Sequence, residues 1–259
     1  MNATANASVN NSNFGLTGLR ALVTGGGSGI GKAIADAMIN AGATVVVCDV
    51  NDSTKPNYVC DVSLTSDVEA MFAGIERDIG GLDILVNNVG VPGPTARVDQ
   101  MHPDAYDECV RINLGGTFRC THVAVPMLLK SKGSIINIST SAGIYGYPLR
   151  SPYVAAKWGI IGLTKSWAME LGEFGVRVNA ICPGSVSGPR MDGVIEREAL
   201  ATGATPSDIR TGYEKQVSLQ TFVDASDIAA SAVFLSSPAA RFITGQVLPV
   251  DGNIETMRA

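Results

Sequence analysis

The chain has 259 residues, of which 46% are hydrophobic and 17% charged, and a net charge of −5. This composition fits a large α/β domain and excludes a disordered or fibrous chain. Scattered Lys and Arg residues exclude a nucleic-acid partner, no apolar run is long enough for a membrane span, and the two histidines predict no metal site.

Residues 1–14 are rich in Asn, Ala and Ser and lack the basic start and apolar centre of a signal peptide. We expect this segment to be a disordered tail, followed by one domain over residues 15–259. The five cysteines are widely spaced and contain no Cys-x-x-Cys pair, so they are expected to be reduced thiols. These features predict a cytoplasmic protein.

The first predicted strand, residues 20–24, runs into a glycine-rich turn, and a helix follows the turn. Backbone N–H groups at the start of such a helix bind a pyrophosphate, and positions without side chains allow its approach. The strand, turn and helix therefore predict a dinucleotide site that includes Gly25, Ser28, Gly29, Ile30 and Gly31.

A second strand, residues 43–48, is followed by Asp49, close to the spacing at which an acidic residue binds the adenosine ribose hydroxyls. A carboxylate at this position repels a 2′-phosphate, and Val50, Asn51 and Ser28 supply no compensating cation. The sequence therefore favours NAD over NADP, although a solvated acid at a strand end is the alternative reading.

Further predicted elements are a short strand near residue 58, a helix over 65–79, a strand over 82–86 and a helix over 103–130. Because parallel strands end at the cofactor crevice in open α/β sheets, the strand ends add four candidate cofactor residues, Asp61, Val62, Asn88 and Gly90. Asn113 lies inside the predicted long helix, where asparagine competes for backbone hydrogen bonds, and this placement indicates a function.

The next strand, residues 133–140, carries a run of hydroxyls at its carboxyl end, and a helix after Pro152 places Tyr153 and Lys157 one turn apart on the same face. A nearby ammonium favours the phenolate and lowers the pKa of a phenol from its usual value near ~10. The pair is therefore a candidate acid/base unit, with a surface tyrosine and lysine as the alternative.

A strand over residues 175–181 leads to Pro183, Gly184 and Val186, and residues 187–222 form a polar insertion with helical pieces near 192–200 and 206–217. An insertion at a strand's carboxyl end is expected to be a substrate lid. Its three arginines either meet an anionic substrate group or lie on solvated faces: Arg190, Arg197 and Arg210. Four aromatic residues line the pocket or only pack: Tyr145, Tyr147, Trp158 and Tyr213. A helix over 227–236 and a strand from 246 complete the chain.

Taken together, several motifs resemble the short-chain dehydrogenase/reductase family: Thr24-Gly-x-x-x-Gly-Ile-Gly31, Asn87-Asn-Val-Gly90, Asn113, Tyr153-x-x-x-Lys157 and Pro183-Gly184. The resemblance implies a Rossmann-type, doubly wound, seven-stranded parallel sheet and hydride transfer between a secondary alcohol carbon and a nicotinamide. It also implies a homotetramer. It assigns acid/base chemistry to Tyr153, the nicotinamide ribose to Lys157, a relay water to Asn113, and the nicotinamide itself to the segment from Pro183 to Val186.

One position departs from the family pattern. The family carries a serine thirteen residues before the tyrosine, where this chain has Thr140. Threonine keeps the hydroxyl that would bind the reacting oxygen, while its methyl group stiffens χ1. We assign the role to Thr140, with Ser141 as the second choice, because strand alternation turns Ser139 to the opposite face. A capping or turn function for all three hydroxyls is the alternative.

The sequence as a whole predicts an NAD-dependent dehydrogenase that oxidises a sugar, polyol or cyclic secondary alcohol. An NAD(P)H-dependent carbonyl or 3-oxoacyl reductase is a second possibility within the same chemistry. A catalytically idle dinucleotide-binding sensor or scaffold is the alternative from another class of protein.

Overall fold

The computed structural model of this chain describes residues 14–254 and is built on a parallel sheet of seven strands. The spatial order of the strands is β3-β2-β1-β4-β5-β6-β7. The strands are β1 (Arg20–Thr24), β2 (Thr44–Asp49), β3 (Tyr58–Val59), β4 (Ile84–Asn87), β5 (Ser134–Ile138), β6 (Arg177–Pro183) and β7 (Val247–Val250). The order reverses between β1 and β4, which opens a crevice at their carboxyl ends. The predicted Rossmann-type sheet is confirmed, and residues 1–13 of the predicted tail lie outside the described part of the chain.

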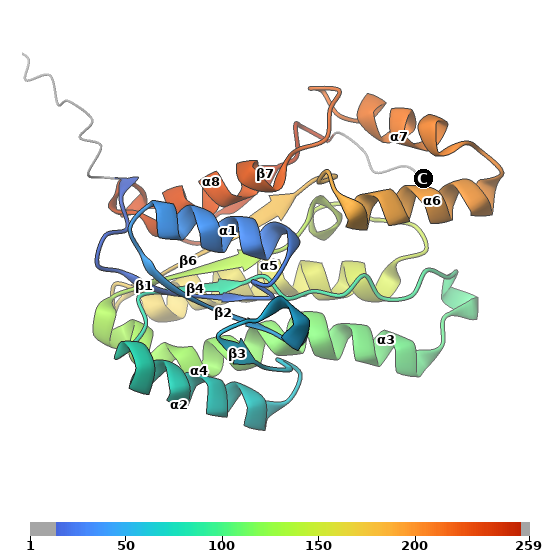
Figure 1. The fold of residues 1–259 in the computed structure, drawn as a ribbon. Helices are drawn as coiled ribbons and strands as arrows, with labels where there is room; N and C mark the ends of the chain where they lie inside the picture. Colours follow the sequence, from blue (N-terminus) through green and yellow to red (C-terminus); the bar gives the residue numbers. More distant parts are fainter. Residues whose placement is uncertain (1–13, 255–259) are drawn as a thin grey trace, which may run out of the picture.

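Helices cover both faces of the sheet (Figure 1). On one face lie α1 (Gly29–Asn40) and α8 (Ala225–Ser236); on the other lie α2 (Thr65–Ile79), α4 (Gly116–Ser131) and α5 (Ser151–Gly172). Alternation along the strands sends Leu22 and Leu85 into one core and Val23 and Val86 into the other. Strands buried on both faces explain the uninterrupted apolar runs in the sequence.

The predicted helix over residues 103–130 is continuous but irregular. It consists of α3 (Pro103–Val110), a π-helical turn (Arg111–Gly115) and α4. Within the turn, Asn113 Nδ2 donates to the carbonyl of Cys109 at 2.8 Å, which gives this carbonyl a side-chain donor. An asparagine side chain competes with backbone groups for hydrogen bonds inside a helix, and here this competition occurs at a π-turn. Such turns are frequent at functional sites.

Two further helices, α6 (Pro189–Thr202) and α7 (Pro206–Lys215), project from the body above the carboxyl ends of the strands (Figure 1). Both begin with a proline, and α7 has a capping box between Thr205 and Asp208. Isolated bridges between Val186 and Val223 and between Val217 and Ile254 tie this segment to the body. None of the helices among residues 14–254 is long and apolar enough to cross a bilayer.

Candidate active site

The glycine turn is held against β4 by Asn88. The Nδ2 atom of Asn88 donates to the carbonyls of Thr24 at 3.0 Å and Gly25 at 3.1 Å. A Cβ atom on Gly31 would lie 2.1 Å from the Gly25 oxygen, so only glycine fits where α1 starts. Ser28 precedes α1 without a side-chain capping bond, which leaves N–H groups of the first turn free for an anion. The turn thus fits a pyrophosphate.

Asp49 lies beside this turn at the end of β2. Its carboxylate accepts hydrogen bonds from the backbone N–H groups of Gly27 at 3.2 Å and Asn51 at 3.0 Å. The next two candidates are placed differently, because the Asp61 carboxylate accepts from Ser63 N at 2.9 Å and the Val62 side chain is buried in the core. Asp49 is therefore the candidate whose carboxylate adjoins the glycine turn.

Tyr153 and Lys157 lie side by side on the first turns of α5, with Lys157 Nζ 5.8 Å from the centroid of the Tyr153 ring. Nζ also donates to the carbonyl of Ile138 at 2.9 Å, which anchors the ammonium to the end of β5. The Lys157 side chain is buried, and this burial, followed by the positive charge of Arg190, lowers its pKa to about 8. Lys157 therefore remains mostly charged at neutral pH.

Asn113 is fully buried beside this pair. Its Nδ2 atom donates to the carbonyls of Val91 and Cys109, whereas its Oδ1 atom has no hydrogen-bond partner. A Cβ atom on Gly90 would lie 2.9 Å from Asn113 Oδ1 and 3.3 Å from Lys157 Nζ, so these two groups meet across the glycine. A buried acceptor without a donor requires a water or a ligand group, and one placed here would also be near the ammonium.

The three consecutive hydroxyls after β5 have different partners. Ser139 Oγ donates to the carbonyl of Lys157 at 2.9 Å, and Ser141 Oγ donates to Asp251 Oδ2 at 2.9 Å. Thr140 Oγ1 makes only a long contact of 3.4 Å with the carbonyl of Pro183. Thr140 therefore keeps a hydroxyl available for a ligand, whereas those of Ser139 and Ser141 serve the fold.

The end of β6 closes the site from the other side. The Gly184 backbone N–H donates to the carbonyl of Val250 at 3.1 Å, and a Cβ atom on Gly184 would lie 2.7 Å from that of Asp251. Val186 then pairs with Val223 at the base of the projecting helices. The segment from Pro183 to Val186 thus joins the strand ends to α6.

Two polar residues of the site were missed at the sequence level, Arg150 and Asp251. The guanidinium carbon of Arg150 lies 5.3 Å from the centroid of the Tyr153 ring and 5.8 Å from that of Tyr147. Arg150 could have been found in the sequence as a cation three residues before the candidate tyrosine. Asp251 has no local sequence signal, because it contacts Ser141 from 110 residues away.

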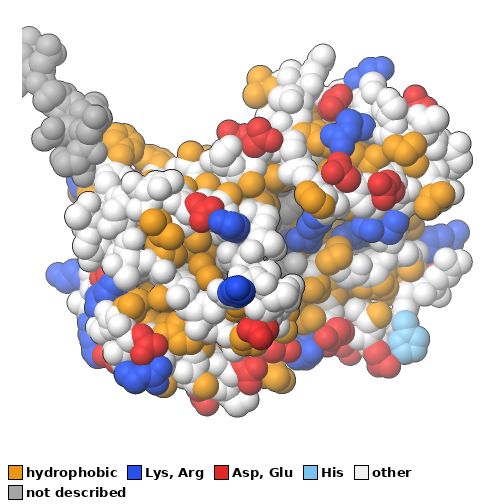
Figure 2. All heavy atoms as spheres, in the orientation of Figure 1, with side chains coloured by type: hydrophobic (Ala, Val, Ile, Leu, Met, Phe, Trp, Pro, Cys, Tyr) orange, Lys and Arg blue, Asp and Glu red, His pale blue; other side chains and the backbone are white. Residues whose placement is uncertain are grey.

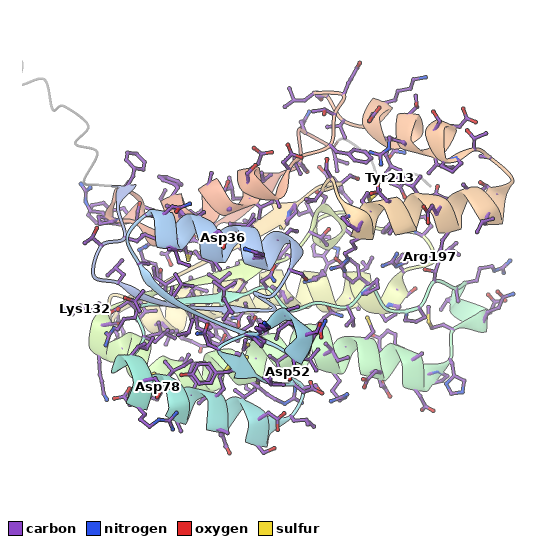
Figure 3. The ribbon with its side chains drawn as sticks, viewed as in Figure 1. Asp36, Asp52, Asp78, Lys132, Arg197 and Tyr213 are labelled. Atoms are coloured by element: carbon purple, nitrogen blue, oxygen red, sulfur yellow. The ribbon has the colours of Figure 1, made fainter. Side chains whose placement is uncertain are left out.

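The predicted lid arginines have different surroundings. Arg210 pairs with Asp192 at 2.5 Å and stacks on Phe222. Arg190 Nη1 approaches the carbonyl of Gly90 at 3.5 Å, and Arg197 is exposed below α6 (Figure 3). Only Arg190 of these three therefore reaches the candidate site.

Comparisons with known proteins place this arrangement in a family. The model described as enoyl-(acyl carrier protein) reductase matches residues 25–253. The chain belongs to the short-chain dehydrogenase/reductase family. D-beta-hydroxybutyrate dehydrogenase of Cupriavidus necator is 37% identical over 254 residues, covering 92% of this chain and 98% of the relative.

Solved dehydrogenases of similar fold carry either nicotinamide cofactor. NAD+-bound xylitol dehydrogenase has a TM-score of 0.85 at 27% identity and covers 94% of this chain and 100% of its own. A gluconate 5-dehydrogenase from Burkholderia cenocepacia in complex with NADP and tartrate has a TM-score of 0.84 at 29% identity. The match covers 94% of this chain and 97% of the gluconate 5-dehydrogenase. This short-chain dehydrogenase/reductase is therefore an oxidoreductase acting on alcohols, with a nicotinamide cofactor.

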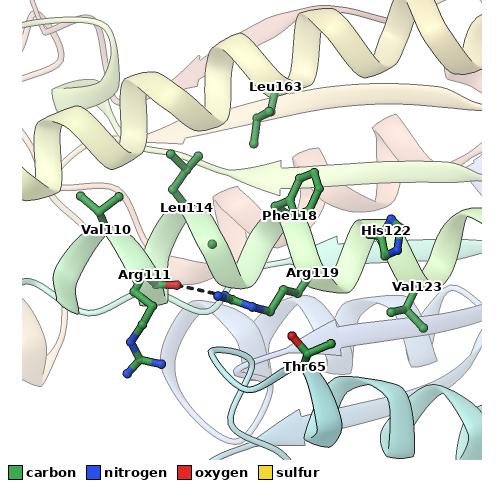
Figure 4. Close-up of a pocket in the computed structure, with 10 residues that line it drawn as sticks. Thr65, Val110, Arg111, Leu114, Phe118, Arg119, His122, Val123 and Leu163 are labelled. Atoms are coloured by element: carbon green, nitrogen blue, oxygen red, sulfur yellow. Dashed lines mark hydrogen bonds between the residues drawn. The ribbon is translucent and has the colours of Figure 1, made fainter. Parts of the chain in front are cut away.

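Away from the candidate site, the chain has an apolar hollow of about 530 Å³ on the outer surface of α4 (Figure 4). We call it the α4 groove; it is lined by Thr65, Val110, Arg111, Leu114, Gly115, Phe118, Arg119, His122, Val123 and Leu163. Within residues 14–254, no cluster of three His, Cys, Asp or Glu side chains could hold a metal ion.

Proposed function

We propose that this protein is an NAD-dependent dehydrogenase that oxidises a secondary alcohol, such as a sugar, polyol or cyclic alcohol, with Tyr153 as general base. The observation that carries the proposal is the buried Lys157 ammonium beside the Tyr153 ring. The unpartnered Oδ1 of Asn113 and the available hydroxyl of Thr140 complete a site with one group for each task.

In the oxidation direction, Thr140 donates a hydrogen bond to the alcohol oxygen and fixes its orientation. Tyr153, as phenolate, takes the hydroxyl proton while the C–H bond breaks and the C=O bond forms. A bound nicotinamide supplies the acceptor for the departing hydride. Lys157 stabilises the phenolate by its charge, and Asn113 Oδ1 accepts from a water that carries the proton onward. Positioned base catalysis of this type contributes ~10²–10⁴-fold.

The proposed cofactor is NAD. The Asp49 carboxylate beside the glycine turn is favourable for two ribose hydroxyls and unfavourable for a 2′-phosphate. No ion pair in residues 14–254 includes Asp49, so its charge is not neutralised by a cation of the described chain. Turnover with NADP faster than with NAD would refute this assignment.

The direct test is the formation of NADH, followed at 340 nm, across sugars, polyols and cyclic secondary alcohols, with wild type and Tyr153→Phe. We expect Tyr153→Phe to lose at least ~10²-fold in kcat, because the proton acceptor is absent, while the Kd for NAD changes less than ~3-fold. Robust turnover by Tyr153→Phe would remove the tyrosine from the proton step. NAD binding without turnover of any alcohol would favour an idle dinucleotide-binding protein.

A reductase of carbonyl or 3-oxoacyl substrates is the second candidate, favoured by the 3-oxoacyl-[acyl-carrier-protein] reductase of Thermotoga maritima, which is 32% identical over 254 residues. The same residues serve this reaction in reverse, with Tyr153 as proton donor. Consumption of NADH or NADPH with 3-oxoacyl thioesters, faster than alcohol oxidation under matched conditions, would favour it.

We also propose a homotetramer in which the α4 groove is an interface between subunits. Phe118 in the groove is 49% exposed, and Trp158 on the neighbouring α5 is 48% exposed. Apolar surface of this kind on adjacent helices favours burial against another subunit. All five cysteines are buried free thiols, which supports the expected cytoplasmic location. Helices α6 and α7 are the proposed substrate lid.

A further inference from the structure

The cleft between the proposed lid and the body is positively charged, although the chain carries a net charge of −5. Lys and Arg side chains gather along this hollow (Figure 2). Within residues 14–254, Lys157, Arg150 and Arg190 form no ion pair with a carboxylate. A cleft that concentrates charge opposite to that of the whole protein attracts an anion.

Two acidic residues of the proposed lid already have partners. Asp192 pairs with Arg210 at 2.5 Å, and Glu198 Oε2 accepts a hydrogen bond from Tyr213 at 2.7 Å. Asp251, which lies behind the hydroxyls after β5, accepts from Ser141. Arg150 and Arg190 donate to backbone carbonyls and not to carboxylates, so their charges are open to an anion from outside the described chain.

Arg150 is the arginine that lies over the Tyr153 ring. Its guanidinium stacks over the rings of Tyr147 and Tyr153, a contact that fixes its plane. Nη2 donates to the carbonyl of Pro92 at 2.7 Å, while Nε is buried without a partner. Because a guanidinium has five N–H donors, most of the hydrogen-bonding capacity of Arg150 is unused by the chain.

The backbone before Arg150 has an unfavourable conformation. Leu149 has φ +63°, in the left-handed region that residues with a side chain rarely adopt, and its carbonyl accepts from Ala96 N at 3.0 Å. Such conformations persist where the surrounding structure fixes them, often at ligand sites. This turn presents Arg150 to the Tyr153 ring.

We propose that Arg150 binds a carboxylate of the substrate, so that the preferred substrate is a hydroxy acid whose carboxylate lies a few carbons from the reacting alcohol. This inference rests on the proposed function and narrows its substrate class. A fixed guanidinium edge matches a carboxylate with two parallel hydrogen bonds. The distance from Arg150 to the Tyr153 ring keeps the carboxylate near the alcohol oxygen.

Arg190 has a different task. It contacts Gly90 at the carboxyl end of β4, where the cofactor crevice opens, and its charge acts on Lys157. We therefore assign Arg190 to a phosphate of the proposed cofactor. The substitution Arg190→Gln therefore distinguishes the substrate carboxylate from the cofactor phosphate. We expect it to raise the Kd for NADH several-fold and to leave the preference for a hydroxy acid over its ester unchanged.

The test compares a four-carbon 3-hydroxy acid with its methyl ester, which differ at the charged group. We expect wild type to favour the acid ~10–100-fold in kcat/KM, the range of a hydrogen-bonded charge. Arg150→Gln should lose this preference by lowering kcat/KM for the acid alone, and Arg150→Lys should restore part of it. Arg241→Gln is the matched control, because Arg241 also stacks on an aromatic ring, that of Phe242, at 5.1 Å.

Three results would overturn the proposal: equal use of acid and ester by wild type, an equal loss for both substrates in Arg150→Gln, or a loss of the preference in Arg190→Gln instead. Oxidation of both substrates without discrimination refutes the carboxylate site and leaves the dehydrogenase intact. If neither is oxidised, calorimetric titration of NADH-loaded protein with malonate and malonamide decides the point. Binding of malonate that Arg150→Gln weakens at least tenfold supports the site, and equal binding of the two refutes it.

Discussion

At the scale of single residues, the hydroxyl proposed to contact the substrate is distinguished by the partners of its neighbours. Ser141 and Ser139 already have acceptors, Asp251 Oδ2 and the Lys157 carbonyl, so moving either hydroxyl onto a substrate would break a buried hydrogen bond of the fold. Thr140 has only the long contact with Pro183. The threonine at the family's serine position is therefore the residue best able to exchange its partner for a substrate oxygen.

This assignment predicts different effects of two substitutions at Thr140. Thr140→Ser keeps the hydroxyl and should lower kcat less than ~5-fold. Thr140→Val keeps the shape of the side chain but lacks the hydroxyl, and it should lower kcat ~10²–10³-fold, which is the effect of removing one donor to a reacting oxygen. Steady-state kinetics with the best alcohol of the panel measures both. Ser141→Ala is the control and should retain kcat per folded molecule; similar losses for Thr140→Ser and Thr140→Val would contradict the hydroxyl role.

The burial of Lys157 makes the stability of the protein depend on pH. The pKa of Lys157 is lowered from 10.5 to about 8, mainly by burial, so the folded chain releases this proton before the unfolded chain does. Between these values the unfolded chain binds more protons, and the contribution of Lys157 to the free energy of unfolding therefore increases as the pH rises. Below about pH 8 the Lys157 ammonium is charged and buried, and it therefore destabilises the folded chain when no ligand is bound.

Urea unfolding of wild type and Lys157→Met at pH 7 and pH 10 tests this sign. The free energy of unfolding of wild type should increase relative to the variant by up to ~3 kcal/mol between the two pH values. Comparison with the variant removes the contributions of other titrating groups. A constant difference between the two proteins would show that Lys157 has the same pKa folded and unfolded.

At the scale of elements, the proposed lid is joined to the loop that precedes α5. Tyr213, which lies on α7 (Figure 3), donates to Glu198 on α6 at 2.7 Å, and the hydroxyls of Tyr147 and Tyr213 lie 2.9 Å apart. Burial, followed by the neighbouring Tyr147, raises the pKa of Tyr213 above its usual range, so this hydroxyl stays neutral. Both lid helices are thereby bonded to the segment that carries Arg150.

Removing this link should loosen the lid without altering the chemistry. Tyr213→Phe keeps the ring, which packs edge-on against Phe222, and loses both hydrogen bonds. We expect hydrogen exchange in residues 189–215 to accelerate ~5-fold or more and KM to rise, while exchange in β1 and β4 stays the same. Unchanged exchange in α6 and α7 would show that the hydroxyl does not hold the lid.

At the scale of the whole molecule, the apolar hollow and the cleft lie on different parts of the structure. The α4 groove is lined mainly by α4 and by the π-turn before it, which contains Asn113, and Leu163 of α5, the helix that carries Tyr153, completes one side. A subunit that covers the groove would therefore also hold these helices against the sheet. The proposed assembly would in this way be linked to the geometry of the candidate site.

A charge in the groove should dissociate the proposed tetramer. Phe118→Glu places a carboxylate where an apolar contact is expected and should reduce the mass measured by light scattering to that of a dimer or monomer. Phe242→Glu is the matched control, since Phe242 is 89% exposed and lies outside the groove. An unchanged mass for Phe118→Glu would exclude the α4 groove as a subunit interface.

Several features of the fold could be predicted from the sequence because local patterns encode them. Apolar runs and the glycine turn gave β1 and the start of α1, and helical periodicity gave α2 with the bounds Thr65–Ile79. The spacing of Tyr153 and Lys157 placed both on one helical face. These inferences succeed because each depends on residues within a few turns of one another.

The sequence by itself determined the order of strands and helices, the dinucleotide turn and the tyrosine and lysine pair, because periodicity and spacing act over short distances. Only the tertiary structure decided which hydroxyl stays available, since Asp251 reaches Ser141 from 110 residues away. It also placed Arg150 between two tyrosine rings and introduced a π-turn at Asn113. These features depend on which distant groups become hydrogen-bond partners, and chain folding alone brings those groups together.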